Sequence, residues 1–436
     1  MSDTMFVQTT EYQAYKDSGF SWIGDVPEHW DVTSLGVCLK AYSEKNRSDL
    51  PLLSITRELG VIERDIEDQE SNHNFIPDDL SGYKVLKKGQ FGMNKMKAWQ
   101  GSYGVSKFTG IVSPAYFIFD FIKDIDPNFF NWAIRSKLYV SYFGSASDGV
   151  RVGQWDLSKT RMKSIPFLIP PREEQASIVR FLDSKAIQID EAIAIKQKQI
   201  ELLKERKQII IQQVVTQGLN PDAPMKDSGV DWVGEIPEHW NVKRLKYVLE
   251  ERNERSKTGE EPLFMVSQVH GLVVRADFHE KAEVAASNID NKIVYKNDLV
   301  FNKLKAHLGV FFKSNIDFKG LVSPDYAVYK SKAYISDMKI LELLFRHPSY
   351  IEQFVIRATG IVEGLIRLYT SELFDIAVPI APENEQREII SFVESQGLKH
   401  DQAIAIQVQQ IEKLKEYKTT LINSAVTGNI KVTELA

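Results

Sequence analysis

The sequence predicts two mixed α/β (α+β) domains, tandemly duplicated and joined by two long helices that form an antiparallel coiled coil. Three observations lead to this fold class. The chain contains an internal repeat, each repeat ends in a long stretch without proline, and each such stretch carries an apolar heptad. The 436 residues are enough for two or three domains with sizeable cores. Hydrophobic residues make up 43% and charged residues 26%, which is ordinary for a globular protein.

The repeat is clearest near the start of each half. Residues 16–30 read KDSGFSWIGDVPEHW and residues 226–240 read KDSGVDWVGEIPEHW, so ten of fifteen positions are identical. Further segments match in the same order: 94–98 (NKMKA) with 302–306 (NKLKA), 110–114 (GIVSP) with 320–324 (GLVSP), and Glu174-Gln175 with Glu385-Gln386. The period of about 210 residues is far longer than that of a solenoid repeat. The chain is therefore predicted to be a tandem duplication.

Each half has the same two-part plan. Residues 31–170 and 241–380 mix short β-branched and aromatic runs with Gly-rich turns, which predicts compact α/β domains of unknown strand order. Residues 172–217 and 383–427 contain no proline and almost no glycine, so long helices are expected there. The predicted division is therefore 1–170 for the N-terminal segment and first mixed domain, 171–220 for the first helix, 221–381 for the second mixed domain, and 382–436 for the second helix and C-terminal tail.

In both predicted helices, mostly apolar residues recur at every third or fourth position, with a few polar interruptions. The first series is Ala186, Ile189, Ile193, Lys196, Ile200, Leu203, Lys207, Ile210 and Val214, and the second is Gly397, His400, Ile404, Gln407, Ile411, Leu414, Lys418, Leu421 and Ala425. The polar interruptions match, since Lys196 corresponds to Gln407 and Lys207 to Lys418. This pattern predicts a coiled coil, although each helix packing only on its own domain is an alternative.

The connections constrain the geometry of such a pair. The first helix leads from domain one to domain two, so a second helix that pairs with it must run back, antiparallel. The seam from 186 to 214 would be about 42 Å long at about 1.5 Å per residue. Two domains held slightly more than one DNA turn apart (about 34–36 Å) would suit two half-sites on a duplex. Because the two domains differ in sequence, the two half-sites should differ as well.

Several segments resemble those of type I restriction–modification specificity (S) subunits. They are KDSG followed by W-x-G-x-x-PEHW, the Pro-x-x-Glu-Gln start of each long helix, and the closing INSAVTG at 422–428. The resemblance covers nearly the whole chain. It implies two target recognition domains that read the two parts of a bipartite double-stranded DNA target, separated by a coiled-coil spacer. It also implies partnership with two DNA-adenine methyltransferase (modification) subunits and with restriction/translocation subunits.

The same resemblance implies that this chain is a non-catalytic subunit that binds no cofactor. S-adenosylmethionine, ATP and Mg would belong to the partner subunits. The sequence agrees, because it contains no [DN]-P-P-[YF] methyltransferase tetrapeptide and no G-x-x-x-x-G-K-[ST] nucleotide-binding loop. Its eight histidines show no metal-ligand spacing.

The compartment follows from the cysteine count and the apolar pattern. The single cysteine, Cys38, excludes an internal disulfide and favours a reducing environment. No apolar run reaches the roughly 18 residues that span a membrane, and the N-terminus lacks the features of a secretion signal. We therefore expect a cytoplasmic protein without membrane contact.

The net charge of −5 argues mildly against DNA binding, because phosphate contacts supply most nucleic-acid affinity. The local distribution of charge, in contrast, favours DNA binding. Residues 84–113 contain six lysines and no Asp or Glu, and residues 292–320 contain six lysines against Asp298 and Asp317. Interleaved aromatic residues make these stretches plausible DNA-tracking surfaces. The alternative is a solvated lysine face.

Chemistry suggests roles within these stretches. Asn94, Asn302 and Gln100 carry carboxamides that pair bidentately with adenine. Lysines 95, 97, 303 and 305 are better suited to phosphate. Features shared by both halves cannot make the half-sites differ, so base discrimination is expected in divergent loops, with Arg57 against Gln268 as the favoured pair. The predicted DNA-binding residues are Arg57, Lys88, Asn94, Lys95, Lys97, Gln100, Lys107, Arg151, Gln268, Lys296, Asn302, Lys303, Lys305, His307 and Arg367.

Other features have two interpretations. For Arg151 and Arg367, helix capping or pairing with an acid is the alternative to DNA contact. The tryptophans of the PEHW segments are interpreted as packing anchors, with docking of a methyltransferase subunit as the alternative. Apolar residues off the helix seam, such as Ile195, Ile209, Ile211 and Ile406, offer that partner a larger surface.

Two rival functions remain open. One is a coiled-coil adaptor whose end domains bind proteins without sequence-specific DNA recognition. The other is a self-sufficient nuclease or methyltransferase, against which the absence of catalytic motifs argues. The sequence does not distinguish a restriction system from one that only methylates.

Overall fold

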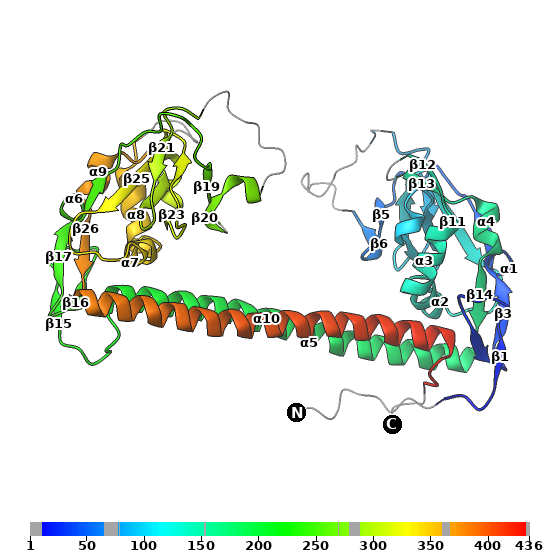
Figure 1. The fold of residues 1–436 in the computed structure, drawn as a ribbon. Coiled ribbons are helices and arrows are strands. Elements are labelled where there is room, and N and C mark those ends of the chain that lie inside the picture. Colours follow the sequence, from blue (N-terminus) through cyan, green and yellow to red (C-terminus); the bar gives the residue numbers. More distant parts are fainter. Residues whose placement is uncertain are drawn as a thin grey trace. The chain divides into compact units, whose positions relative to one another are not determined.

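The computed structural model describes residues 11–64, 77, 79–151, 154–268, 270–278, 288–359 and 367–432 (Figure 1). The chain forms two compact units. Unit 1 contains Met1–Gln197 together with Val408–Ala436, and unit 2 contains Lys198–Gln407. Each unit thus combines one mixed domain with a part of both long helices, and unit 1 is assembled from both ends of the chain. The four-segment division expected from the sequence stays a prediction.

Unit 1 contains short strands and helices before the first long helix. Its strands are β1 (Tyr15–Asp17), β2 (Asp25–Pro27), β3 (Asp31–Ser34), β4 (Leu39–Tyr42), β5 (Leu53–Thr56), β6 (Gly60–Glu63), β7 (Lys84–Leu86), β8 (Phe91–Asn94), β9 (Tyr103–Val105), β10 (Gly110–Val112), β11 (Tyr116–Phe121), β12 (Asp148–Arg151), β13 (Gln154–Asp156) and β14 (Pro166–Ile169). Its short helices are α1 (Leu35–Cys38), the 3₁₀ helix η1 (Ala98–Gln100), α2 (Pro127–Ile134), α3 (Lys137–Ser145) and α4 (Lys159–Ser164).

Unit 2 repeats this series. Its strands are β15 (Met225–Asp227), β16 (Glu235–Pro237), β17 (Asn241–Arg244), β18 (Leu249–Glu251), β19 (Phe264–Ser267), β20 (Gly271–Val274), β21 (Lys292–Val294), β22 (Leu299–Asn302), β23 (Phe311–Lys313), β24 (Gly320–Val322), β25 (Tyr326–Ser331) and β26 (Ala377–Ile380). Its short helices are α6 (Leu245–Val248), η2 (Arg275–Asp277), η3 (Lys303–Leu308), α7 (Lys339–Leu344), α8 (Pro348–Arg357) and α9 (Thr370–Phe374).

The strand pairing confirms the duplication. The four-stranded sheet of unit 1 has the order β4-β11-β8-β9, and that of unit 2 has the matching order β18-β25-β22-β23, antiparallel throughout. The smaller pairs also match, because β1–β2, β3–β14, β5–β6 and β7–β10 correspond to β15–β16, β17–β26, β19–β20 and β21–β24. Hairpin β12–β13 corresponds to the bridge between Thr359 and Arg367. The two mixed domains are therefore copies of one fold.

The two long helices, α5 (Arg172–Gln217) and α10 (Glu383–Thr427), span the lengths expected from the sequence. They pack antiparallel within each unit, as Figure 1 shows. In unit 1 the Lys418 ammonium lies 2.7 Å from the Asp190 carboxylate, and in unit 2 Lys207 lies 2.7 Å from Asp401. The predicted seam positions are all buried or half-buried. The predicted fold class is therefore confirmed, with mixed strand-and-helix domains and two long helices that lie antiparallel within each unit.

Each unit has its own core, and each core is completed by the end of a long helix. Leu421, Ala425 and Val426, near the end of α10, belong to the core of unit 1. Val214 and Val215, near the end of α5, belong to the core of unit 2. The helix pair is therefore part of both domain cores and is more than a linker.

The helix ends require glycine. Gly218 follows α5 and Gly428 follows α10, both with a φ of +77°, a conformation in which a side chain is strained. A Cβ on Gly428 would lie 2.3 Å from the Pro27 side chain and 3.3 Å from that of Trp30. Each long helix therefore ends directly on a PEHW segment.

No helix in the described parts of the chain is long and apolar enough to cross a membrane.

Candidate nucleic-acid interface

The N-K-x-K-A turns lie at the ends of equivalent central strands. Asn94 ends β8 opposite Tyr116, and Asn302 ends β22 opposite Tyr326. The Asn94 side-chain oxygen accepts the backbone N–H of Met96 at 3.2 Å, and the Asn302 oxygen accepts that of Leu304 at 3.0 Å. These asparagines form local turns, a role for which their short side chains suit them.

Both tyrosines also contact their asparagine. Burial raises the pKa of Tyr116 and of Tyr326, and in each case a hydrogen bond with the Asn94 or Asn302 side chain acts in the opposite direction. Each carboxamide is thus engaged by its own turn and by the neighbouring strand.

A second segment joins each turn. The backbone N–H of Leu157 donates to the Lys95 carbonyl at 3.3 Å, and that of Leu368 donates to the Lys303 carbonyl at 3.1 Å. Leu157 directly follows hairpin β12–β13, and Leu368 follows the equivalent bridge. The structure therefore brings the segments of Arg151 and Arg367 to the lysine turns. The Arg151 side chain lies outside the described residues, while Arg367 pairs with Asp325 at 3.4 Å.

Unit 1 adds an aromatic pair at this place. Trp99 of the turn stacks on Trp155 of β13, with ring centroids 5.2 Å apart and planes 26° apart. The Trp155 side chain remains exposed. Its equivalent in unit 2, Ile366, lies outside the described residues, as does the side chain of His307, the equivalent of Trp99. Sequence reasoning overlooked Trp155, because only the folded hairpin carries it to Trp99.

The turn that carries Arg57 is held by hydrogen bonds from Arg135. The Arg135 guanidinium donates to the carbonyls of Arg57, Glu58 and Tyr103 at 3.0, 2.8 and 2.6 Å. Tyr103 begins β9, so the Arg57 turn lies beside the Asn94 end of that strand. The Arg57 side chain is exposed and pairs with Glu58 at 2.9 Å. Gln268, its predicted counterpart, is exposed in the turn after β19.

Three predicted residues lie at the other end of the strand pairs. The Gly89 N–H donates to the Ser106 carbonyl at 2.8 Å, which places Lys88 and Lys107 at the end of β8–β9 remote from Asn94. Lys296 has the equivalent position beyond β22–β23 and pairs with Asp317. Lys97, Gln100 and Lys305 belong to the turns themselves, where Lys97 and Lys305 are exposed and Gln100 is half-buried. The predicted DNA-binding residues therefore fall into two groups. One group lies on or beside the turns, and the other, which comprises Lys88, Lys107 and Lys296, lies at the remote end of the strands.

The lysine stretch of unit 2 is largely neutralised by acids from elsewhere in the chain. Lys292 and Lys303 pair with Glu251 at 3.3 and 3.6 Å, Lys313 with Asp337 at 2.7 Å, and Lys319 with Glu261 at 3.1 Å. Although burial raises it, the pKa of Glu251 lies below its usual value because Thr370, Lys303 and Lys292 stabilise the carboxylate. Counting charges along the sequence missed these distant partners.

The lysine stretch of unit 1 is less neutralised. Lys87 pairs with Glu44 at 2.8 Å, which raises the pKa of Lys87. Lys88, Lys97 and Lys107 are exposed and have no ion pair among the described residues. The two repeats thus share the same backbone structure, but their lysine stretches differ in how far acidic residues neutralise them.

The fold defines a class of protein: two copies of one α/β domain, each with an N-K-x-K-A turn at the end of a central strand and with parts of two long antiparallel helices. No family model matches the chain. It is 24% identical over 454 residues to the MjaX type I restriction enzyme specificity subunit of Methanocaldococcus jannaschii, covering 96% of this chain and 98% of that protein. It is 23% identical over 448 residues to the MjaVIII specificity subunit of the same organism, covering 97% and 98%.

Solved structures agree. The HsdS subunit from Thermoanaerobacter tengcongensis matches with a TM-score of 0.56 and 16% identity, covering 93% of this chain and 98% of that one. A chain from a structure concerned with complex assembly of a type I R-M system matches with a TM-score of 0.65 and 14% identity, covering 92% and 98%. The predicted resemblance to type I restriction–modification specificity subunits is confirmed, and it extends over nearly the whole chain.

Proposed function

We propose that this chain is the non-catalytic, sequence-specific DNA-binding subunit of a type I restriction–modification enzyme, in which each mixed domain reads one half of a bipartite target. One observation carries the proposal. The scaffold of the turn, formed by the asparagine, its opposing tyrosine and the leucine hydrogen bond, occurs in both units, whereas residues on this turn and on the neighbouring turn differ. Arg57, Trp99 and Gln100 in unit 1 stand against Gln268, His307 and Leu308 in unit 2. A repeated support with divergent side chains fits two unlike half-sites.

The roles follow from chemistry and position. Asn94 and Asn302 hold their turns, so we assign them the task of presenting the neighbouring side chains. Base discrimination is assigned to Arg57 and Gln100 in unit 1 and to Gln268 and His307 in unit 2, whose side chains differ between repeats. Phosphate contact and register are assigned to the remaining cations, which are Lys88, Lys95, Lys97, Lys107, Arg151, Lys296, Lys303, Lys305 and Arg367.

The helix pair offers a docking surface for the methyltransferase subunits. Exposed apolar residues occur at equivalent places of the two repeats: Ile187 and Ile195 on α5 in unit 1, and Leu398 and Ile406 on α10 in unit 2. A surface that the duplication presents twice fits two copies of one partner. Ile209 is also exposed, but Ile211 packs against the core of unit 2 and does not belong to this surface. S-adenosylmethionine, ATP and Mg are assigned to the methyltransferase and restriction/translocation partners.

The test is to express the chain with its cognate methyltransferase subunit in a methylation-deficient host and map N6-methyladenine across the genome. The expected result is a single split motif of two unlike parts with a fixed unspecified gap. A complex that forms but marks no motif would instead favour the protein-binding adaptor. Turnover of S-adenosylmethionine by the purified chain alone would favour a self-sufficient enzyme.

A further inference from the structure

The Arg135 side chain connects two turns of unit 1. Its guanidinium donates to two carbonyls of residues 57–59, between β5 and β6, at 3.0 and 2.8 Å; we call these residues the Arg57 turn. It also donates at 2.6 Å to the carbonyl of Tyr103, which directly follows residues 94–102, the Asn94 turn. A planar guanidinium with five donors can serve three carbonyls in one fixed arrangement. Arg135 therefore fixes the position of the Arg57 turn relative to the Asn94 turn.

Two neighbouring residues allow Arg135 to reach these carbonyls. Asn131, one helical turn earlier, is uncharged, and its side-chain oxygen accepts the Val105 N–H at 3.0 Å. Gly104 of β9 has no side chain, and a Cβ there would lie 3.5 Å from the Gly60 backbone and 3.7 Å from the Arg135 side chain. A large side chain at position 104 would therefore occupy the space between β6 and Arg135.

Unit 2 supports the equivalent turn in a different way. Phe312 is the second residue of β23 and has the place that Gly104 has in β9. A Cβ on Gly271, at the start of β20, would lie 3.3 Å from the Phe312 ring. A Cβ on Gly60, at the start of β6, would lie 3.0 Å from Nη1 of Arg135. An aromatic ring in unit 2 thus takes the place of the guanidinium in unit 1.

Arg346 is the equivalent of Arg135 and has other partners. Glu342 takes the place of Asn131, because its carboxylate accepts the backbone N–H of the residue after Phe312 at 2.9 Å. Arg346 lies four residues after Glu342 and pairs with it at 3.0 Å. Its guanidinium lies 5.1 Å from the centre of the Phe312 ring. In the described part of the turn between β19 and β20, no carbonyl accepts a hydrogen bond from Arg346.

We propose that Arg135 is a positioning residue for base recognition by unit 1, which holds the Arg57 turn and the Asn94 turn as one reading surface. The inference rests on the proposed DNA-binding function, which assigns base discrimination to Arg57 and Gln100 on these two turns. The hydrogen bonds of Arg135 go to backbone carbonyls, so they leave the Arg57 side chain exposed. Arg346 has no such role, because Phe312 supports the turn of unit 2.

The test uses the full-length chain with its cognate methyltransferase subunit in a methylation-deficient host, with N6-methyladenine mapped across the genome. Arg135→Gln removes the charged donors that hold the Arg57 turn, and Arg135→Lys keeps the charge without the planar fork. Arg346→Gln is the matched control, because it removes the equivalent cation of unit 2. Arg57→Ala identifies the base positions that the Arg57 turn reads. Thermal unfolding monitored by circular dichroism identifies any variant that does not fold.

The readout is the base preference at each position of the methylated motif. Arg135→Gln should lower discrimination by about tenfold at the positions of one half-site that Arg57→Ala also relaxes, which is the discrimination that one bidentate contact supplies. Arg135→Lys should relax the same positions to a smaller extent. Arg346→Gln should keep the parent preferences in both half-sites. A residue that only stabilised the fold would lower methylation at all sites without changing these preferences.

The outcomes separate this inference from the proposed function. Parent preferences in the folded Arg135 variants, or in Arg57→Ala, would overturn the positioning role and leave the proposed function standing. A relaxed half-site in Arg346→Gln would overturn the contrast between the two units. A parent chain that forms the complex and marks no split motif would overturn the proposed function instead.

Discussion

At the scale of single residues, one carboxylate explains two sequence motifs. Glu174, from the Pro-x-x-Glu-Gln start of α5, accepts from the indole N–H of Trp30 at 2.9 Å and from the Tyr12 hydroxyl at 3.1 Å. It also lies 2.5 Å from His29 Nε2. Burial, followed by the charge of this carboxylate, raises the pKa of Tyr12. The PEHW segment and the helix start therefore form one structural joint.

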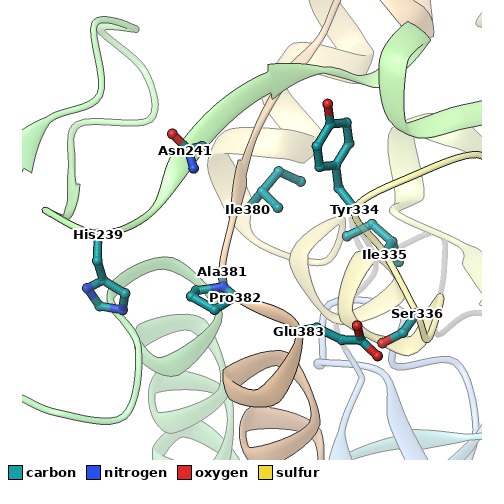
Figure 2. Close-up of a pocket in the computed structure, with 9 residues that line it drawn as sticks. All are labelled: His239, Asn241, Tyr334, Ile335, Ser336, Ile380, Ala381, Pro382 and Glu383. Carbon is teal, nitrogen blue, oxygen red and sulfur yellow. The ribbon is translucent and has the colours of Figure 1, made fainter.

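Unit 2 contains the same joint with fewer members. Glu385 accepts from the Trp240 indole at 2.9 Å and lies 2.7 Å from His239 Nε2. Figure 2 shows His239 on one side of Pro382 and Glu383 on the other side, near Ser336, and these residues line a pocket of about 420 Å³. The sequence predicted that the tryptophans pack inside the protein, and Trp30 and Trp240 are indeed buried. Sequence reasoning did not connect the tryptophan with this carboxylate, because 144 residues separate Trp30 from Glu174.

We predict that Glu174→Ala lowers the free energy of unfolding by about 1–3 kcal/mol, because it leaves the buried Trp30 N–H without an acceptor. Glu174→Gln should cost less, since its amide oxygen still accepts. Urea denaturation followed by tryptophan fluorescence measures the change. Glu173→Ala is the matched control, as Glu173 is the exposed neighbour in the same helical turn. Equal losses in Glu173→Ala and Glu174→Ala would contradict the role assigned to the joint.

At the scale of elements, the sequence predicted the long helices better than the short ones. Runs without proline and a regular heptad determine α5 and α10 locally. The sequence therefore predicted the bounds of both helices correctly. α2 and α3 show why the short helices were predicted less well, since the Ser136 side chain accepts the Tyr139 N–H and so separates two helices that are only two residues apart. The order of the short strands depends on pairing between distant segments, which local patterns do not encode.

The lysines that interrupt the heptad also need the structure to be understood. Lys207 on α5 reaches Asp401 on α10, and Lys418 on α10 reaches Asp190 on α5, both at 2.7 Å. The sequence showed these residues as matched but gave no partner for them. The pairs form in this antiparallel register, so they favour it over shifted pairings.

We predict that Asp401→Lys destabilises the helix pair by about 0.2–1 kcal/mol through repulsion of Lys207, as is usual for partly exposed ion pairs. The double variant Asp401→Lys with Lys207→Asp should recover most of the loss. A double-mutant cycle from urea midpoints gives the coupling free energy. Additive effects of the two substitutions would show that the pair contributes nothing to the register.

At the scale of the whole molecule, each mixed domain is held by a two-stranded stem. Asp31 pairs with Ile169 where the chain enters and leaves the first domain, and Asn241 pairs with Ile380 in the second. The joint of Glu174 and Trp30 and the end of α10 lie outside this stem. Sequence reasoning did not foresee the acids that neutralise unit 2, because they come from distant segments. The asymmetry between the repeats is thus a tertiary property.

The stem makes a domain exchange feasible and its outcome specific. Residues 31–170 contain both strands of the stem, so replacing them with the equivalent segment of a related specificity subunit keeps β3–β14 paired and leaves α5 and α10 unchanged. We predict that the N6-methyladenine motif then changes in one half only, while the other half and the gap remain. The reciprocal exchange of residues 241–380 should change the opposite half. A change of both halves after one exchange would mean that the two domains do not read DNA independently. A changed gap would mean that the mixed domain, and not the helix pair, sets the spacing.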